Sequence, residues 1–209
     1  MTDGEPRYPR KEFTVTDLRV LHRVIDELSL ATLISNGDAE IMVSHVPLIR
    51  RAADNPLGTL VGHLDRNNPH AHVLDGAPVV AVFRGPDSYI SPTVYATRQL
   101  PTWNSIVVEV RGIARVTHDS EEVRASLVRM AAHLERGPRP FVLADDDRRV
   151  GPLLAHIVGF EISIASVEGR FKLGQDKSAE DRANTNRRLL ARTPPSEQAL
   201  VADLLDLPD

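Results

Sequence analysis

The sequence predicts an α+β protein in which an antiparallel β-sheet closes into a small barrel and helices pack outside it. Segments with strand patterns follow one another between residues 30 and 117, separated by turn signals. Asn36-Gly37, the strongest hairpin signal in the chain, joins the first two of them. Helical periodicity is found mainly before residue 29 and after residue 118. Hairpins, rather than parallel crossovers, are therefore expected to build the sheet.

The first half of the chain is predicted to contain two helices and four strands. Residues 17–28 are expected to be helical because apolar residues recur on one face and Thr14 and Asp17 form a capping box. A short helix is expected at 67–75, with Asn68 as its N-cap and Pro69 in its first turn. The strands are expected at residues 30–35, 39–49, 57–64 and 78–83.

The second half begins with a predicted loop at residues 84–100, because Gly85-Pro86 and Ser91-Pro92 are typical breakers. One long strand is expected at 102–117, with a bulge or bend at Gly112. The strongest helix signal covers 119–136, capped by Asp119 and Glu122. The remaining predictions are a helix within 145–158, strands at 160–166 and 170–173, and helices at 178–192 and 196–205.

Length and composition limit the class of protein. The 209 residues are expected to form one domain over 1–209, with a core at about 10–175 and a helical tail at about 176–209. The net charge is −4 and the charges are mixed, so no nucleic-acid partner is expected. The absence of Cys excludes thiolate catalysis and Cys-ligated metals. Without a signal-like start or an apolar run of roughly 18 residues, a cytoplasmic protein with no membrane partner is expected.

Common catalytic motifs are absent from the sequence, including G-x-S-x-G, G-x-G-x-x-G, a Walker loop and H-E-x-x-H. Eight His residues remain as candidate ligands. His70 and His72 are two apart on a short helix, so they are expected at the solvated surface rather than as a chelating pair. His45 lies on a strand and His63 at a strand end, and each is either a hydrogen-bonded core residue or a ligand.

The functional residues are expected between Gly62 and Ser105. In this stretch, Arg84 and Tyr89 lie among rigid turns that follow a buried strand. Thr102, Trp103 and Asn104 then lead into the next strand, and Trp103 is the only Trp of the chain. An amphipathic aromatic residue beside polar side chains is suited to hold a flat ligand. A Trp that plugs the barrel end explains the same pattern equally well.

Several motifs of this chain, in the same order, closely resemble the PaiB-like family. They cover roughly residues 10–190 and are specific as a set. The matching segments are Ser44-His45-Val46-Pro47-Leu48, residues 57–64, Asn68-Pro69, Phe83-Arg84-Gly85-Pro86, Tyr89-Ile90-Ser91-Pro92, Pro101-Thr102-Trp103-Asn104, residues 168–173 and residues 177–182. The resemblance implies FMN binding, a split β-barrel fold and a homodimer. Some members of the family are described as negative transcriptional regulators.

The chain departs from the usual family pattern beside the implied cofactor. Val94 stands where a Trp is usual and Ser105 where a Tyr is usual, while Ala71 and Phe171 fall near two other usual Trp positions. The basic loop is cut to residues 96–100, which leaves Arg98 and Arg84 as candidates to hold the FMN phosphate. A wider pocket with fewer phosphate ligands would suit a larger macrocycle.

One branch of this family, the haem-dependent piperazate synthases, is similar in these respects. The resemblance implies an enzyme that uses haem b to cyclise N5-hydroxyornithine by forming an N–N bond. Because no Cys is present, His and Tyr are the possible axial ligands of the iron. His63 is the first candidate, since it ends a strand that faces the expected pocket, and His45 is the second. Tyr89, Tyr95 and Arg84 are the candidate catalytic residues, with Arg84 or Arg98 pairing with the substrate carboxylate.

Two other functions stay open at this point. The first is an FMN-binding regulator or oxidoreductase, with the flavin across Trp103 and Asn104 and its phosphate near Arg98. Thr102 is a further candidate for a cofactor contact. The second is a non-catalytic binder of a small molecule. A small-molecule substrate and a second copy of the chain are the partners that the resemblance implies.

Overall fold

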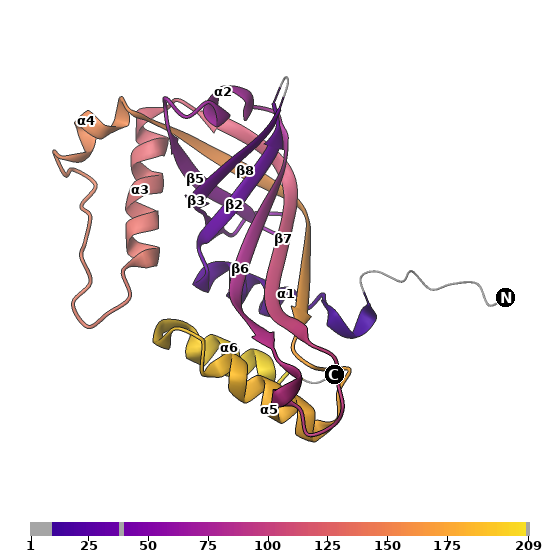
Figure 1. Cartoon of the computed structure of the whole chain (residues 1–209). Helices are drawn as coiled ribbons and strands as arrows, with labels where there is room; N and C mark the ends of the chain where they lie inside the picture. The colour runs from indigo at the N-terminus through magenta and orange to yellow at the C-terminus, as the bar shows by residue number, and fades with distance from the viewer. Residues whose placement is uncertain (1–9, 38–39, 208–209) are drawn as a thin grey trace. The chain divides into compact units, whose positions relative to one another are not determined.

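The computed structural model describes residues 10–37 and 40–207 (Figure 1). Its sheet has the strand order β3-β2-β6-β7-β8-β5-β4, and β1 pairs with β8 outside this path. Antiparallel pairs join β2 to β3, β4 to β5, β5 to β8 and β1 to β8. The predicted fold class, an antiparallel split β-barrel with flanking helices and a helical C-terminal tail, is confirmed.

The bounds of the elements follow the sequence order. The strands are β1 (Thr14–Val15), β2 (Leu30–Asn36), β3 (Ile41–Pro47), β4 (Ile49–Arg51), β5 (Thr59–Asp65), β6 (Pro78–Ile90), β7 (Thr102–Thr117) and β8 (Ile157–Lys172). The α-helices are α1 (Leu18–Glu27), α2 (His70–Val73), α3 (Ser120–Leu134), α4 (Val150–Leu154), α5 (Ala179–Leu190) and α6 (Gln198–Leu205). Short 3-10 helices cover Lys11–Phe13 (η1), Pro92–Val94 (η2) and Pro195–Glu197 (η3).

The chain divides into two compact units, and β6, β7 and β8 each contribute residues to both. Among the described residues, the helix unit contains 10–28, 83–109 and 167–207, which include α1, α5 and α6. The hairpin unit contains 29–37, 40–82 and 110–166, which include the β2–β3 hairpin, α2, α3 and α4. The expected single domain over residues 1–209 stays a prediction.

The β2–β3 hairpin of the hairpin unit confirms the hairpin predicted from Asn36-Gly37, although Asn36 is still paired within β2 and the connection covers residues 37–40. Its register runs from Leu30 opposite Pro47 to Asn36 opposite Ile41, and the Gly37 amide donates to the Glu40 carbonyl at 2.8 Å. The remaining two residues of the connection, 38 and 39, lie outside the described part. Alternate residues of β2 are buried, as expected for a strand that covers a core on one face.

Two glycines permit close approaches between strands in the hairpin unit. A Cβ on Gly112 would lie 2.3 Å from the Ser163 carbonyl oxygen of β8. A Cβ on Gly62 would lie 2.6 Å from the Leu48 side chain. Strand β7 continues through position 112. The residue there is a glycine because the neighbouring backbone leaves no room for a side chain.

Helix α1 of the helix unit begins at Asp17, but the predicted capping box with Thr14 does not form. Asp17 is the N-cap of α1 and accepts from the Arg19 amide at 2.9 Å, while Thr14 donates to the Arg10 carbonyl instead of closing a capping box. The apolar face of α1 buries Leu21, Val24 and Ile25. Arg23 of α1 forms an ion pair with Asp203 of α6 at 2.7 Å.

Four predicted boundaries are wrong. Strand β6 continues to Ile90 through the predicted loop, because extended backbone suits the fixed φ of Pro86 and the bare Gly85 leaves room for Leu28 and Ile106. The predicted return strand at 39–49 is divided into β3 and β4. Only Val150–Leu154 of residues 145–158 is helical, and the two predicted strands between 160 and 173 are one strand, β8.

His70 is fully buried, which corrects the expectation of a surface residue. Its Nε2 bonds to the Ser35 hydroxyl and its Nδ1 to the Ser44 hydroxyl, both at 2.9 Å. Asn68 accepts from the His70 amide at 3.0 Å and donates to Ser44 at 3.1 Å. The short helix α2 is thereby fixed to β2 and β3, a long-range arrangement that helical spacing alone does not reveal.

We predict that His70 makes folding stability depend on pH. Burial lowers the pKa of the His70 imidazole from its ordinary 6.5, so its contribution is complete above pH 6.5 and is lost as the pH falls toward the lowered value. His70→Gln should reduce the free energy of unfolding by about 1–3 kcal/mol at pH 7.5, since two buried hydroxyls lose good partners. The substitution should also remove part of the decrease in the free energy of unfolding that accompanies acidification.

Urea unfolding at pH 7.5 and 5.5 measures both effects. His72→Gln is the matched control, because His72 lies in the same helix and is exposed. Equal unfolding curves for the two variants would contradict the assignment.

Candidate functional site

Three of the predicted site residues, Arg84, Tyr89 and Trp103, lie together in the helix unit. The Arg84 guanidinium forms an ion pair with Asp87 at 2.7 Å, and the Trp103 Nε1 donates to the other oxygen of Asp87 at 2.6 Å. The Tyr89 and Trp103 rings are 6.0 Å apart and tilted by 57°. Trp103 is 52% exposed and Tyr89 is 49% exposed. The cluster therefore offers aromatic surface to a ligand, held in place by one carboxylate.

Trp103 and Asn104 point to opposite faces of β7, as neighbours in a strand must. Asn104 is only 1% exposed, and among the described residues its Nδ2 has no hydrogen-bond partner. Trp103 therefore lies on an exposed face of the strand and Asn104 on a buried one. The cofactor contacts predicted for each stay predictions.

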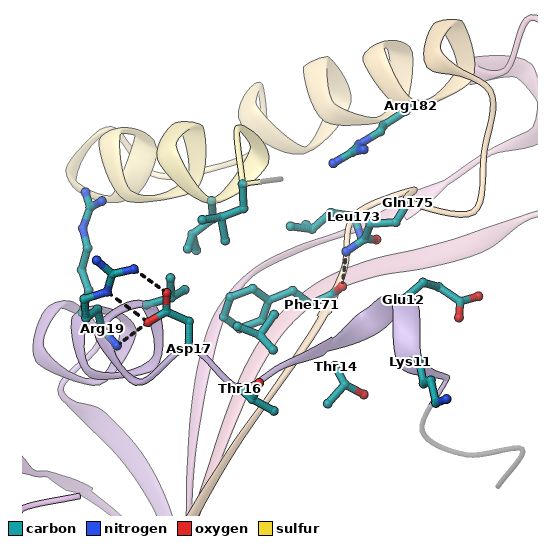
Figure 2. A pocket seen from close by; sticks show the side chains of 15 residues that line it. Lys11, Glu12, Thr14, Thr16, Asp17, Arg19, Phe171, Leu173, Gln175 and Arg182 are labelled. Carbon is teal, nitrogen blue, oxygen red and sulfur yellow. Dashed lines mark hydrogen bonds and ion pairs between the residues drawn. The ribbon is translucent and has the colours of Figure 1, made fainter. Parts of the chain in front are cut away.

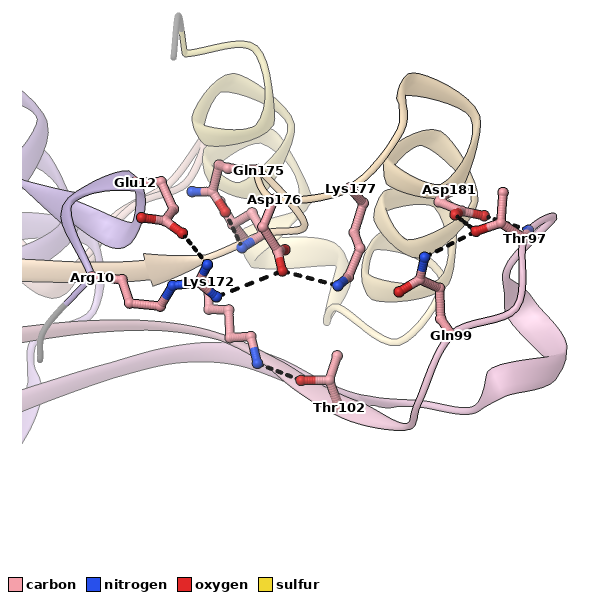
Figure 3. Close-up of polar contacts among 11 residues, drawn as sticks. Arg10, Glu12, Thr97, Gln99, Thr102, Lys172, Gln175, Asp176, Lys177 and Asp181 are labelled. Atoms are coloured by element: carbon pink, nitrogen blue, oxygen red, sulfur yellow. Dashed lines mark hydrogen bonds and ion pairs between the residues drawn. The ribbon is translucent and has the colours of Figure 1, made fainter. Parts of the chain in front are cut away.

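Arg98 and Thr102 line one pocket of about 470 Å³, which is also lined by Lys177 from the segment before α5. The other lining residues are Gln99, Leu100 and Pro101. Lys172, the last residue of β8, donates a hydrogen bond to the Thr102 hydroxyl (Figure 3). We call this the basic pocket. Its two cations and the adjacent Lys172 make it suited to an anionic group such as a phosphate or a carboxylate.

The charges around the basic pocket are partly balanced. Lys177 forms an ion pair with Asp176 at 2.9 Å, and Arg10 lies 3.9 Å from the same carboxylate (Figure 3). Burial lowers the pKa of the Lys172 ammonium, while Asp176 opposes this shift. A partly buried ammonium that is costly to charge gains from the arrival of an anion.

Asp181 of α5 fixes the loop that carries Arg98. Its carboxylate is fully buried and accepts from the amides of Ala96 at 2.6 Å and Thr97 at 3.2 Å, and from the Thr97 hydroxyl at 2.5 Å. These hydrogen bonds, with the Thr97 hydroxyl first, hold the pKa of Asp181 below its ordinary value. Gln99 donates to the same hydroxyl at 3.0 Å, so the order extends on both sides of Arg98.

Tyr95, a predicted catalytic residue, is buried in the helix unit. Burial is the main cause that raises the pKa of its hydroxyl; Asp176 and Asp181 add to the shift and Lys177 opposes it. The phenol, which is protonated near neutral pH in any case, is thereby made a weaker acid. It can donate a hydrogen bond, or a proton to a strongly basic leaving group.

The two candidate iron ligands, His63 and His45, belong to the hairpin unit. His63 lies on β5 opposite Gly159 and is half-buried; burial lowers the pKa of its imidazole, which is thus neutral at pH 7. Within the described ranges, the His63 Nδ1 is buried without a hydrogen-bond partner. His45 is exposed, and its Nδ1 bonds to the Thr32 hydroxyl at 3.1 Å.

A haem iron requires one proximal side chain, and a neutral imidazole is a suitable donor. His63 fits this requirement by its protonation state and its buried Nδ1. No group of three or more His, Asp or Glu in residues 10–37 and 40–207 is arranged to hold a metal ion by itself. In the same part of the chain, no helix is both long and apolar enough to cross a membrane.

Sequence reasoning gave no role to four residues that shape the helix unit: Asp87, Lys172, Lys177 and Asp181. The last three lie in the segments that carry the family resemblance, and this was the available signal. What the sequence did not show is the pairing of residue 172 with residue 102, or of residue 181 with residues 96 and 97, since these partners are 70 or more positions apart.

Comparison with known proteins identifies the family. The model of the family described as "Putative FMN-binding domain" matches residues 7–166, so the chain belongs to this family. It is 26% identical over 202 residues to the protease synthase and sporulation protein PAI 2 of Bacillus subtilis, covering 95% of this chain and 96% of the relative. A protein of Aspergillus fumigatus is 28% identical over 188 residues, covering 66% and 72%.

Two solved structures share the fold. One is the FAD and haem binding protein of Mycobacterium smegmatis, with a TM-score of 0.60, 18% identity and coverage of 82% of this chain and 79% of that one. The other is the flavocytochrome Anf3 of Azotobacter vinelandii, with a TM-score of 0.59, 16% identity and coverage of 82% and 75%. At these identities the likeness concerns the fold alone.

We predict that Asp181 is required for order in the loop around Arg98. Asp181→Ala leaves two amides and a hydroxyl without their acceptor, so the loop should open more often. Trypsin should then cut after Arg98 roughly tenfold faster than in the unchanged protein. In the Asp181→Asn protein, which keeps one acceptor oxygen, the rate of cleavage after Arg98 should lie between those of the unchanged protein and the Asp181→Ala protein.

Glu180→Ala is the matched control, because Glu180 is an exposed neighbour in the same helix. Mass spectrometry of the digests identifies the cleaved bond. Equal rates of cleavage after Arg98 in the Asp181→Ala and Glu180→Ala proteins would refute this role.

Proposed function

We propose that this chain is a PaiB-type flavin-binding protein that holds the phosphate of FMN in the basic pocket. The observation that carries the proposal is the convergence of Arg98, Lys177 and Thr102 on one pocket, with Lys172 bonded to Thr102. The family match to an FMN-binding domain supports the identity of the cofactor. An oxidoreductase and a flavin-binding regulator are both compatible with it.

The chemistry of the four side chains suits a phosphate dianion. The Arg98 guanidinium presents a fork of N–H donors, the two ammonium groups act as point charges, and the Thr102 hydroxyl can donate once Lys172 binds its oxygen. Lys172 and Lys177 also supply the positive charge that the shortened loop at 96–100 lacks. The inference that a loss of phosphate ligands favours a larger macrocycle is weakened accordingly.

We predict that the phosphate carries much of the affinity for FMN. Arg98→Ala and Lys177→Ala should each weaken FMN binding about tenfold, since each removes a charge-assisted contact at a partly exposed site. Binding of riboflavin, which lacks the phosphate, should change little in both variants. Arg192→Ala is the control, because Arg192 is exposed and lies outside the pocket.

Quenching of Trp103 fluorescence gives the measurement, since it is the only Trp. Flavin fluorescence provides an independent reading. If FMN and riboflavin bind equally well, or if neither binds, the phosphate site is wrong.

A second candidate function is the haem-dependent cyclisation of N5-hydroxyornithine. The observation that favours it is His63, whose imidazole is neutral and whose buried Nδ1 lacks a partner in the described chain. His63 would be the axial ligand of haem b, with His45 as the alternative. The family resemblance to piperazate synthases supports this reading, and the two solved structures show that the fold accommodates flavin and haem proteins.

In that reaction the haem iron would act as a Lewis acid toward the hydroxylamine oxygen. The α-amine of the substrate attacks N5, the N–O bond breaks, and the oxygen leaves as water after it gains protons. Because both nitrogens belong to one molecule, holding the substrate folded supplies much of the acceleration. The protonated Tyr95 phenol is suited to donate a proton, and Arg84 is suited to pair with the substrate carboxylate. Tyr89 is the second candidate for proton transfer.

We predict that, if haem is the cofactor, the purified protein shows a Soret band that His63→Ala abolishes or shifts. His45→Ala should leave the band unchanged. Two flavin bands without a Soret band would exclude the haem reading, and a band that is insensitive to His63→Ala would exclude His63. A colourless protein that takes up neither cofactor would favour a non-catalytic binder.

We further propose that the protein is a homodimer that uses the outer face of the β2–β3 hairpin. Leu30 and Ile41 are each 67% exposed there and Val43 is 54% exposed, and β3 ends the strand order of the sheet. Exposed apolar side chains gathered on an edge hairpin are typical of a protein interface. The family resemblance makes a second copy of this chain the expected occupant.

Val43→Glu should therefore convert the dimer to a monomer, because a carboxylate at the centre of the contact would lose its water. Leu153→Glu is the matched control, since Leu153 of α4 is 55% exposed outside the hairpin. Sedimentation analysis reads the mass. A monomeric unchanged protein, or a dimeric Val43→Glu protein, would contradict this interface.

A further inference from the structure

Two adjoining pockets lie in the hairpin unit, at the end of the sheet where β5 finishes and β8 starts. Asp65, the last residue of β5, pairs with Ile157, the first of β8, and α2 lies at the same end (Figure 1). Each pocket has a volume of about 300 Å³. Both are lined by Arg66 and His118, so they meet at these two side chains. We call the pocket beside α2 the imidazole pocket and the one beside α4 the α4 pocket.

Arg66 brings to both pockets a guanidinium whose charge no carboxylate balances. Its Nε donates to the Ala155 carbonyl at 2.8 Å and its Nη2 to the Ile157 carbonyl at 3.1 Å. Within residues 10–37 and 40–207, the exposed Arg66 forms no ion pair. The two carbonyls occupy the side edge of the guanidinium. Its end edge, formed by Nη1 and the second hydrogen of Nη2, is therefore open to an anion.

Two exposed His residues add imidazole donors to the imidazole pocket. His72 lies on α2, and His118 directly follows β7. In the described part of the chain, neither imidazole has a hydrogen-bond or ion-pair partner. Helix α2 is fixed to β2 and β3 through His70, so His72 is held on a supported element. Both rings therefore have N–H groups to offer to a ligand.

The acidic groups at this end of the hairpin unit are mostly engaged. Among the described lining residues Asp75 is the only acid, and one of its oxygens accepts from the Val116 amide at 3.0 Å. Asp65 and Asp119 lie next to lining residues in the sequence, but each carboxylate accepts from backbone amides of its own turn. With neutral imidazoles, Arg66 and Asp75 cancel in formal charge. A His side chain ordinarily gains a proton as the pH falls through about 6.5, so mild acid gives the lining an excess of positive charge.

The α4 pocket supplies accessible apolar surface beside this charge. Leu154 of α4 and Ile157 of β8 line it, and both are half-buried, so part of each side chain can receive a ligand. Ser120, the first residue of α3, adds an exposed polar residue to the wall. An anionic group at Arg66 is thus placed next to a surface that a small organic group can cover.

We propose that the two pockets bind a phosphate monoester, with its phosphate at Arg66, His72 and His118 and its organic group on Leu154 and Ile157. The oxygens of a tetrahedral anion diverge, so they reach a guanidinium edge and two separate ring N–H groups better than a planar carboxylate does. The described linings share no residue with the basic pocket. This site therefore goes beyond the proposed flavin function and does not depend on which cofactor the protein holds.

Sulfate is the first probe, because it stays a dianion between pH 5.5 and 7.5 and any pH dependence of its binding then belongs to the protein. The titration uses the whole chain carrying Arg98→Ala, which weakens the phosphate site proposed for FMN. At constant ionic strength, sulfate should bind about tenfold more tightly at pH 5.5 than at pH 7.5. It should shift the ring-proton NMR signals of His72 and His118. Acetate should bind at least tenfold more weakly than sulfate.

Variants locate the anion. Arg66→Gln should weaken the binding of sulfate at pH 5.5 about tenfold, and so should the double variant His72→Gln/His118→Gln. The double variant should also remove the pH dependence, and it replaces only exposed side chains, so its result does not depend on a loss of folding. Arg139→Gln is the control, because Arg139 is exposed in the same unit and lies outside both pockets.

Phenyl phosphate tests the organic part of the ligand. It should bind about tenfold more tightly than inorganic phosphate at pH 5.5, because its ring covers Leu154 and Ile157. Leu154→Gln should remove this gain, whereas Leu153→Gln, at an exposed neighbour outside the pocket, should not. The proposal is overturned if sulfate shows no saturable binding or binds equally at both pH values. Equal affinity for sulfate in the Arg139→Gln and double His proteins, or equal affinity for the two phosphates, would overturn it as well.

Discussion

The buried carboxylate of Asp181 is the interaction on which the organisation of the helix unit depends. A charge without solvent is tolerated only when donors surround it, and two amides and a hydroxyl of residues 96 and 97 do so here. The segment between β6 and β7 is thus attached to α5, although it has little regular structure of its own. The positions of Arg98 and Thr102, and the shape of the basic pocket, follow from this attachment.

Local signals predicted much of the fold. The hairpin at Asn36-Gly37, the start of α1 at Asp17 and the cap at Asp119 were correct, because such features depend on a few neighbouring residues. The extension of β6 and the burial of His70 were missed. Both are decided by partners far away in the sequence, Ile106 in one case and Ser35 in the other, which no local pattern identifies.

The candidate site shows the same division between what local signals predict and what contacts between distant residues decide. Arg98 and Thr102 were predicted as cofactor residues, and the structure places them around one pocket. Lys172 and Lys177 complete the positive charge of that pocket, but they come 70 or more residues after Thr102, so their role required the fold. The burial that raises the pKa of Tyr95 and lowers the pKa of His63 is also a property of the fold rather than of the sequence pattern.

The end of β8 separates two pockets because successive side chains of an extended strand point to opposite faces. Phe171 and Leu173 line a pocket of about 600 Å³ beside α1 (Figure 2), while Lys172 between them bonds to Thr102 at the basic pocket. A one-residue insertion or deletion just before Phe171 would exchange these faces and place an ammonium among leucines. Evolution of this segment is therefore restricted to replacement of side chains, and changes in its length are expected only beyond Leu173.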